Sequence, residues 1–121
     1  MEYLSLRRCQ RPIKHVILNF FALLANNITE LGLNITRHNL FTDDAFFYRK
    51  DLHMNLALQK LIKLGQTNEE ITNDMTEEEM AEYLLVIVRG IVLDWCVNNG
   101  DQNLAEMMDK FMKRVLLSVC A

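Results

Sequence analysis

The sequence predicts an all-α fold, an antiparallel bundle of helices in a single domain. One proline and four glycines in 121 residues are too few for a protein built from β-turns. Apolar residues recur at three- and four-residue steps in four segments, as on one face of an α-helix, and no long segment alternates as a strand does. A chain of this length buries roughly two-thirds of its unfolded surface, which is enough for one core.

The first helix is expected to start near Pro12, because proline suits the first turn of a helix. Residues 32–39 contain glycine and asparagines that are expected to end it. A second helix is expected over residues 52–65, with Thr42, Asp43 and Asp44 ahead of it as caps for a short helix start. The apolar stripe of the first helix consists of Ile13, Val16, Ile17, Phe20, Leu24, Ile28 and Leu31.

The third helix has the clearest start signal. Thr76 and Glu79 have the spacing of a capping box, and Met75 and Met80 have that of a hydrophobic staple. The acidic residues 77–79 stabilise the positive end of a helix dipole, so we interpret them as a helix start and not as a metal site. The run Asn98-Asn99-Gly100 is a stop signal for this helix.

The fourth helix follows this stop, with Asp101 or Asn103 as its cap. It has an apolar stripe on one face and charged residues on the other, which is typical of an amphipathic helix. The stripe consists of Leu104, Met107, Met108, Phe111, Met112, Val115, Leu116 and Val119. Periodicity alone leaves open whether this stripe faces the core or a partner.

The third helix is apolar on nearly all sides between Leu84 and Val97. The apolar run from Tyr83 to Val97 is too short for a membrane span, which needs about 20 mostly apolar residues, and it contains Arg89 and Asp94. The other helices of so short a chain cannot easily enclose it, so we expect a second chain to cover part of it. Gly90 in mid-helix suggests that another backbone approaches closely there. Asp94 as a catalytic acid is the weaker alternative, because no second catalytic group has a suitable spacing.

The composition argues against several functions. The net charge of -3 gives no general attraction to nucleic acid. His15, His38 and His53 are scattered, and no Ser-His-Asp, Cys-His, phosphate-loop or metal-ligand pattern occurs, so we expect neither an enzyme nor a cofactor. The three cysteines lack Cys-x-x-Cys spacing, which favours reduced thiols in a cytoplasmic protein.

Two segments, LQKLIKLGQTNEEI and YLLVIVRGIVLDWCVNNGDQNL, resemble the C-terminal regulatory half of TetR-family bacterial repressors. Gly65, Gln66, Glu70 and Ile71 match a Gly-Gln-x-x-Gly-Glu-Ile-like turn of that family. Glu69 stands where the family usually has glycine, so we expect Asn68 to adopt the left-handed conformation instead. The second match, a Gly-(apolar)-(apolar)-x-Trp-like pattern, consists of Gly90, Ile91, Leu93, Asp94 and Trp95, and Leu104 opens the final helix.

The resemblance implies an effector-sensing domain over residues 12–121 that dimerises through its last two helices, with residues 1–11 as a stub or the remnant of a connecting helix. It implies an apolar or aromatic small-molecule effector. No helix-turn-helix precedes Pro12 in this sequence, so we expect no direct DNA contact by this chain, and a fragment of a longer regulator is favoured. The alternative is a stand-alone, antirepressor-like interaction protein.

The implied homodimer interface consists of Leu85, Arg89, Gly90, Val92, Leu93, Asp94, Trp95, Val97, Met107, Met108, Phe111, Met112 and Val115. The implied effector pocket consists of Phe20, Leu24, Phe46, Phe47, His53, Leu58, Tyr83 and Ile87.

Overall fold

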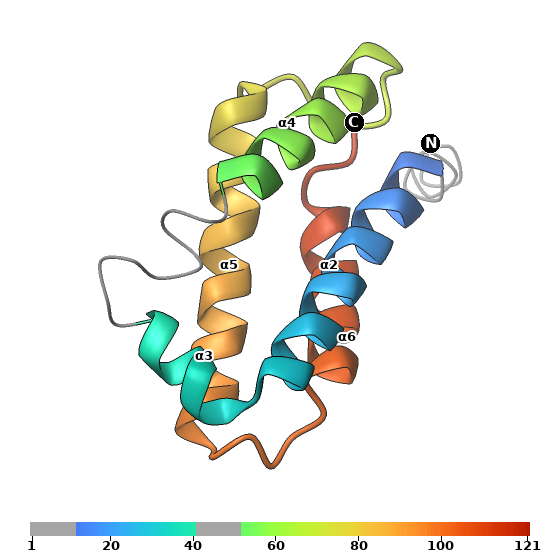
Figure 1. Cartoon of the computed structure of the whole chain (residues 1–121). Helices are drawn as coiled ribbons and strands as arrows, with labels where there is room; N and C mark the ends of the chain where they lie inside the picture. The colour runs from blue at the N-terminus through green and yellow to red at the C-terminus, as the bar shows by residue number, and fades with distance from the viewer. Residues whose placement is uncertain (1–11, 41–51) are drawn as a thin grey trace.

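A computed structural model describes residues 12–40 and 52–121 of the chain. These residues are predominantly helical, which confirms the all-α prediction. Within these two ranges an isolated antiparallel bridge joins Ile71 to Cys120. The helices are α2 (Pro12–Leu31), α3 (Leu33–Leu40), α4 (Leu52–Thr67), α5 (Glu77–Val97) and α6 (Leu104–Leu117) (Figure 1). The predicted cap at residues 42–44 lies outside the described residues.

The helices pack around one apolar core. Helix α2 packs against α6 and α4, α5 packs against α4 and α6, and α3 contacts both α2 and α5 (Figure 1). Each long helix contributes side chains that are at most 1% exposed. Removing such side chains from water is the main favourable contribution to folding. The largest of them are Phe21, Ile17, Ile28, Leu58, Ile62, Met80, Leu84, Leu85, Met108 and Met112.

Helix α3 was not predicted from the sequence, in which residues 32–39 were expected to end the first helix. Gly32 does end α2, with a φ of 92° that an L-residue rarely adopts. Its carbonyl then accepts hydrogen bonds from the backbone N–H of Thr36 at 3.1 Å and from the Thr36 hydroxyl at 2.8 Å. The same glycine therefore ends one helix and starts the next, so the described part of the chain contains five helices where four were expected.

The capping predictions for α5 and α6 are confirmed. Thr76 Oγ1 accepts from the N–H of Glu79 at 3.1 Å, and Glu79 Oε1 accepts from the N–H of Thr76 at 3.0 Å. Helix α5 ends at Val97, and positive φ angles at Asn99 and Gly100 turn the chain toward α6. Of the two candidate caps for α6, Asn103 is the one used, because its side chain accepts from the N–H of Glu106 at 3.1 Å.

Candidate functional site

The outer face of α5 is apolar and open. The exposed fractions are 53% for Val86, 41% for Leu93 and 68% for Val97, and Gly90 lies between them on the same face. Residues 86, 90, 93 and 97 are separated by steps of four, three and four, the spacing of a stripe that packs against another helix. The predicted interface omitted Val86, although this spacing is visible in the sequence.

Gly90 lies in open space within the described structure. A Cβ atom added there would have no described atom within 4 Å, outside the residue's own neighbourhood on α5. The close backbone approach that the sequence suggested at Gly90 is therefore not made by any described segment of this chain. Glycine in the middle of a helix costs about 1 kcal/mol relative to alanine, so Gly90 lowers the stability of α5 and needs another reason to be there.

Helix α6 lies beside this face and runs antiparallel to α5. The hydroxyl of Tyr83, early in α5, is 3.0 Å from Ser118 Oγ at the end of α6. Gly90 and Phe111 each lie seven residues from that contact, so they are at about the same height along the pair. Phe111 is 44% exposed. Phe111 is therefore an exposed aromatic side chain at the height of Gly90 on the neighbouring helix.

Five residues of the predicted interface face the core of the same chain. Leu85, Val92, Trp95, Met108 and Met112 are each at most 5% exposed. Because they already pack within the chain, they are not presented to a second molecule in this conformation. The exposed members of the prediction are Gly90, Leu93, Asp94, Val97 and Phe111, and the partly buried ones are Arg89, Met107 and Val115.

Trp95 packs within its own chain at the end of α5. Trp95 was predicted to lie in a dimer interface, but its indole Nε1 donates to the carbonyl of Gln102 at 2.9 Å within the chain. Its ring also covers Gly100, where an added Cβ would lie 3.2 Å from Trp95 Cζ2. Trp95 therefore fixes the turn between α5 and α6.

The polar residues of α5 lie at the margin of its outer face. Arg89 Nη1 is 3.5 Å from Glu82 Oε1, and the two side chains are 22% and 59% exposed. Ion pairs that stay open to solvent on one side, as this one does at Glu82, contribute little to stability, about 0–1 kcal/mol. Asp94 is exposed, and its backbone carbonyl accepts from the Asn98 side chain at 2.9 Å. These residues form a polar rim beside the apolar stripe.

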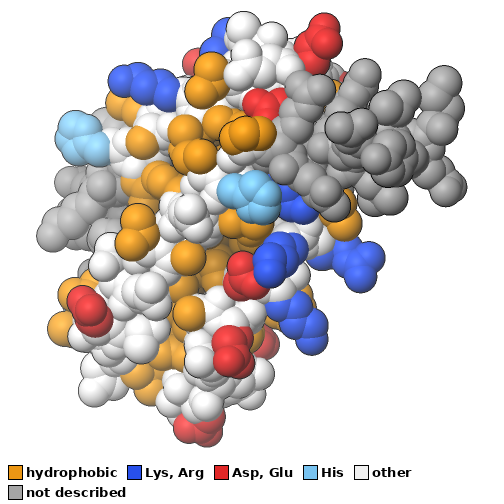
Figure 2. All heavy atoms as spheres, turned by 90° about the vertical axis from the view of Figure 1, so that its right-hand side faces the viewer, with side chains coloured by type: hydrophobic (Ala, Val, Ile, Leu, Met, Phe, Trp, Pro, Cys, Tyr) orange, Lys and Arg blue, Asp and Glu red, His pale blue; other side chains and the backbone are white. Residues whose placement is uncertain are grey.

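The side of the molecule that carries α2 and α6 also has exposed hydrophobic side chains. In Figure 2 hydrophobic side chains on this side are interspersed with lysines, arginines and acidic residues. Leu23 on α2 is 65% exposed and offers a comparison with Leu93, because it is the same residue type on another helix.

The described residues of the predicted pocket differ in burial. Leu24 and Leu58 are in the core, at 4% and 0% exposure, and His53 is exposed. Phe20, Tyr83 and Ile87 are partly buried against the core. The ring of Phe20 packs edge-on against Phe21, with centroids 5.3 Å apart. Phe46 and Phe47 lie outside the described residues.

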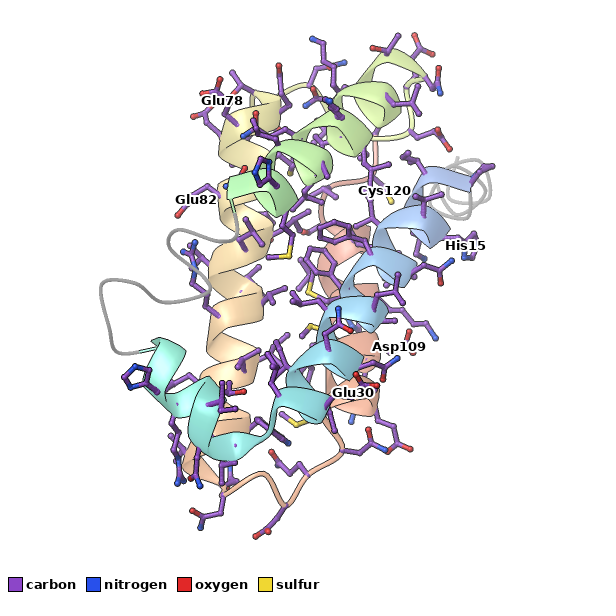
Figure 3. All side chains as sticks on the ribbon, in the orientation of Figure 1. His15, Glu30, Glu78, Glu82, Asp109 and Cys120 are labelled. Carbon is purple, nitrogen blue, oxygen red and sulfur yellow. The ribbon has the colours of Figure 1, made fainter. Side chains whose placement is uncertain are left out.

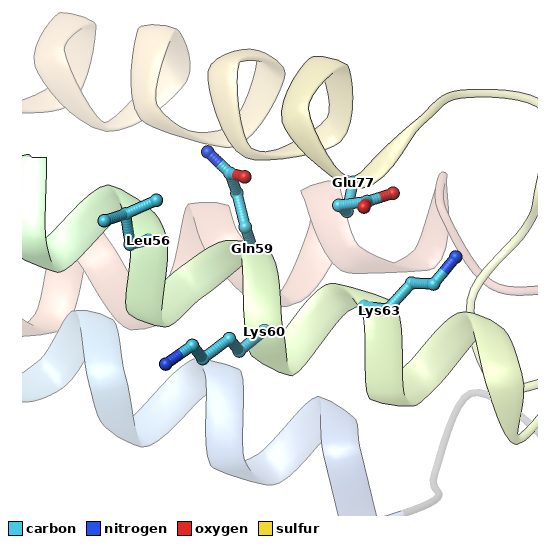
Figure 4. A pocket seen from close by; sticks show the side chains of 5 residues that line it. All are labelled: Leu56, Gln59, Lys60, Lys63 and Glu77. Atoms are coloured by element: carbon cyan, nitrogen blue, oxygen red, sulfur yellow. The ribbon is translucent and has the colours of Figure 1, made fainter.

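A shallow, open cavity of about 240 Å³ lies between α4 and the start of α5, lined by Leu56, Gln59, Lys60, Lys63 and Glu77. Four of the lining side chains come from α4, and Glu77 comes from the first turn of α5 (Figure 4). It contains one aliphatic side chain, two ammonium groups and one carboxylate. These residues can contact a small polar or amphipathic molecule, but they offer no nucleophile with an adjacent base.

Cys96 is a free, buried thiol near the end of α5. Burial raises its pKa above the ordinary value of 9.0, and the Arg37 guanidinium partly opposes this shift. Arg37 Nη2 donates to the Cys96 carbonyl and to Asn99 Oδ1, both at 2.7 Å, so α3 is fastened to the end of α5. Cys120, by contrast, is disulfide-bonded, so the expectation of reduced thiols is wrong for this residue.

The turn after α4 contains the first of the two family-like patterns. Glu69 has a φ of 61°, so the prediction that Asn68 would adopt the left-handed conformation is wrong. The carbonyl of Gly65 accepts from the N–H groups of Glu70 and Ile71, at 2.8 and 3.1 Å. These two hydrogen bonds end α4. The positive φ that the turn requires is at Glu69, the position where the TetR family usually has glycine.

Within residues 12–40 and 52–121, no group of three or more His, Cys, Asp or Glu side chains is placed to hold a metal ion. None of the described helices combines the length and apolarity that crossing a bilayer requires. Comparisons of the chain with protein-family models, curated proteins and solved structures give no match.

Proposed function

We propose that this chain is the effector-sensing and dimerisation domain of a TetR-type transcriptional regulator. In this proposal two copies pair through α5 and α6, and an apolar or aromatic small molecule modulates DNA binding by a separate N-terminal domain. The observation that carries the proposal is the open apolar face of α5, with Val86, Leu93 and Val97 exposed around Gly90.

Physical chemistry favours a helical partner for this face. Exposed apolar side chains at steps of four, three and four form a stripe that fits the groove of another helix. Gly90 supports the same conclusion, because the empty space around it allows a second backbone to come close. A second copy of the chain is the simplest partner, since two-fold homodimers are the commonest soluble assemblies.

The polar groups around the face are compatible with an interface. Arg89 and Glu82 pair with each other at the margin, so the partner need not neutralise a charge at the centre. Phe111 on α6 adds an aromatic side chain that is nearly half exposed. Aromatic residues are enriched at the centres of protein interfaces, where they bury much area at little conformational cost.

The first family-like pattern also supports the proposal, because each matching residue has a structural task. Gly65 leaves room for Ile71, whose Cδ1 would lie 2.6 Å from a Cβ at Gly65. Gln66 is buried, and its amide nitrogen donates to the carbonyls of Thr72 and Met75 at 3.1 and 2.8 Å. The four residues of the pattern together form one particular turn. Their occurrence in this chain therefore favours a fold shared with the TetR family.

Regulation in this proposal is a shift of population. An effector that binds one arrangement of the helices more tightly than another stabilises that arrangement. In this proposal the effector contacts Phe20, Tyr83 and Ile87, the members of the predicted pocket that are partly buried against the core.

Native mass spectrometry of the purified chain tests both parts of the proposal. The expected spectrum contains a species of twice 14.2 kDa, with additional mass where an effector is carried. A spectrum with only the 14.2 kDa chain at all concentrations would contradict the dimer. Titration with a panel of aromatic and aliphatic compounds, followed by thermal shift, tests the effector separately.

A further inference from the structure

The turn between α4 and α5 contacts two distant parts of the chain, the C-terminal tail and the start of α2. Thr72 N–H donates to the carbonyl of Val119 at 2.9 Å, and Ala121 N–H donates to the carbonyl of Glu70 at 3.2 Å. With the bridge between Ile71 and Cys120, these bonds attach the C-terminal tail to the turn. In Figure 3 Cys120 lies on this tail, close in the view to the start of α2, where His15 is labelled.

The same turn also holds the start of α2. Glu70 is 7% exposed, and its Oε1 accepts from the backbone N–H of Ile13 at 3.4 Å. The first N–H groups of a helix have no acceptor within the helix, and negative charge is favourable beside them. Glu70 therefore provides, across 57 residues of sequence, the acceptor that the first turn of α2 lacks.

An apolar contact reinforces this polar one. A Cβ added at Gly65 would lie 3.2 Å from Ile13 Cγ2 and closer still to Ile71. The side chain of Ile13 thus packs against the backbone of α4 beside Ile71, and Ile13 is 5% exposed. The first turn of α2 is positioned by α4 through Gly65 and by the turn through Glu70.

We propose that Glu70 is a positioning residue that couples the part of α4 that lines the cavity to the start of α2. Lys63, which lines the cavity, lies two residues before Gly65 on the same helix. A displacement of α4 relative to α5 therefore moves the Gly65–Glu70 segment, and with it the first turn of α2. The regulatory meaning of this coupling rests on the proposed function, in which a DNA-binding domain precedes α2.

Amide hydrogen exchange measured by NMR on the full chain tests the positioning role. In Glu70→Ala the Ile13 amide is expected to exchange about tenfold faster or more, since a hydrogen bond to a charged acceptor is lost. Glu70→Gln keeps an acceptor oxygen and is expected to restore most of the protection. Glu78→Ala, which removes an exposed carboxylate from the first turn of α5, is the matched control and is expected to leave Ile13 unchanged.

The coupling itself is tested by filling the cavity. Leu56→Trp is expected to shift the Ile13 amide resonance in the wild-type background and not in Glu70→Ala. Equal Ile13 exchange in wild type and Glu70→Ala would overturn the proposal, as would an Ile13 shift that survives in the double variant. Faster exchange throughout α5 in Glu70→Gln would also overturn it, because the residue would then act only on global stability. Dimer mass is recorded on the same samples, so a monomeric wild type would contradict the proposed function without affecting the Ile13 result.

Discussion

Replacing Leu93 with aspartate on the outer face of α5 is expected to separate dimerisation from folding. Leu93 is 41% exposed in the single chain and is not one of its buried core residues, so the variant is expected to fold. Full burial of a leucine side chain contributes about 1.5–3 kcal/mol. If a second copy covers the remaining 41%, the contribution is about 0.6–1.2 kcal/mol per chain and about 1–2.5 kcal/mol per dimer.

The aspartate adds a further cost, because a carboxylate placed in an apolar interface loses its hydration. Together these effects predict a rise in the dimer Kd of about tenfold at least. Sedimentation velocity over a concentration series measures this change, and circular dichroism checks that the variant is folded. Leu23→Asp is the control, since Leu23 is 65% exposed and lies on α2, which is not one of the two helices of the proposed interface. Equal association of wild type, Leu93→Asp and Leu23→Asp would refute the reasoning.

Four other substitutions or conditions test individual contacts. Gly90→Ala is expected to stabilise a monomeric form of the chain by about 1 kcal/mol in urea unfolding, because helix propensity improves and an added Cβ has no described atom within 4 Å; a destabilised monomer would contradict this. Trp95→Ala is expected to cost about 3–5 kcal/mol in thermal unfolding, since Trp95 is 5% exposed and covers the turn after α5; a small loss combined with monomerisation would instead place Trp95 in the interface. Thr76→Ala is expected to cost about 1 kcal/mol by removing the capping box, and an unchanged melting temperature would argue that the cap is dispensable. Burial raises the pKa of Cys96 in the folded chain above 9.0, so the buried neutral thiol contributes its full stability below pH 9.0 and this contribution is lost as the pH rises beyond it. Urea unfolding on both sides of this pH is expected to show a fall in the free energy of unfolding at the higher pH that Cys96→Ala lacks.

Helix starts and stops were predictable where local chemistry decides them. Thr76 and Glu79 satisfy each other's backbone groups across three residues, and Asn103 caps α6 in the same local way. Residues 33–40 were missed because their helix depends on contacts between distant segments. Arg37 binds the end of α5, and Thr36 is 3% exposed against the rest of the fold. A sequence pattern of glycine and asparagine does not contain that information.

The candidate interface was predicted only in part, for a related reason. An α-helix that is apolar all round does not indicate which side its own chain will cover. In the structure Leu85, Val92 and Trp95 take the inner side, and Val86, Leu93 and Val97 remain outside. That division depends on where α4 and α6 pack, which the sequence of α5 alone does not determine. For the same reason, no local pattern predicts that Glu70 lies beside Ile13, which is 57 residues away in the sequence.

Sedimentation equilibrium of the wild-type chain at low micromolar concentration tests the central proposal most directly, namely that the open face of α5 pairs with a second copy. The proposal predicts a mass of twice 14.2 kDa that falls toward 14.2 kDa in Leu93→Asp and stays dimeric in Leu23→Asp. A wild-type mass of 14.2 kDa throughout the concentration range would contradict it, as would a dimer that Leu93→Asp leaves unchanged.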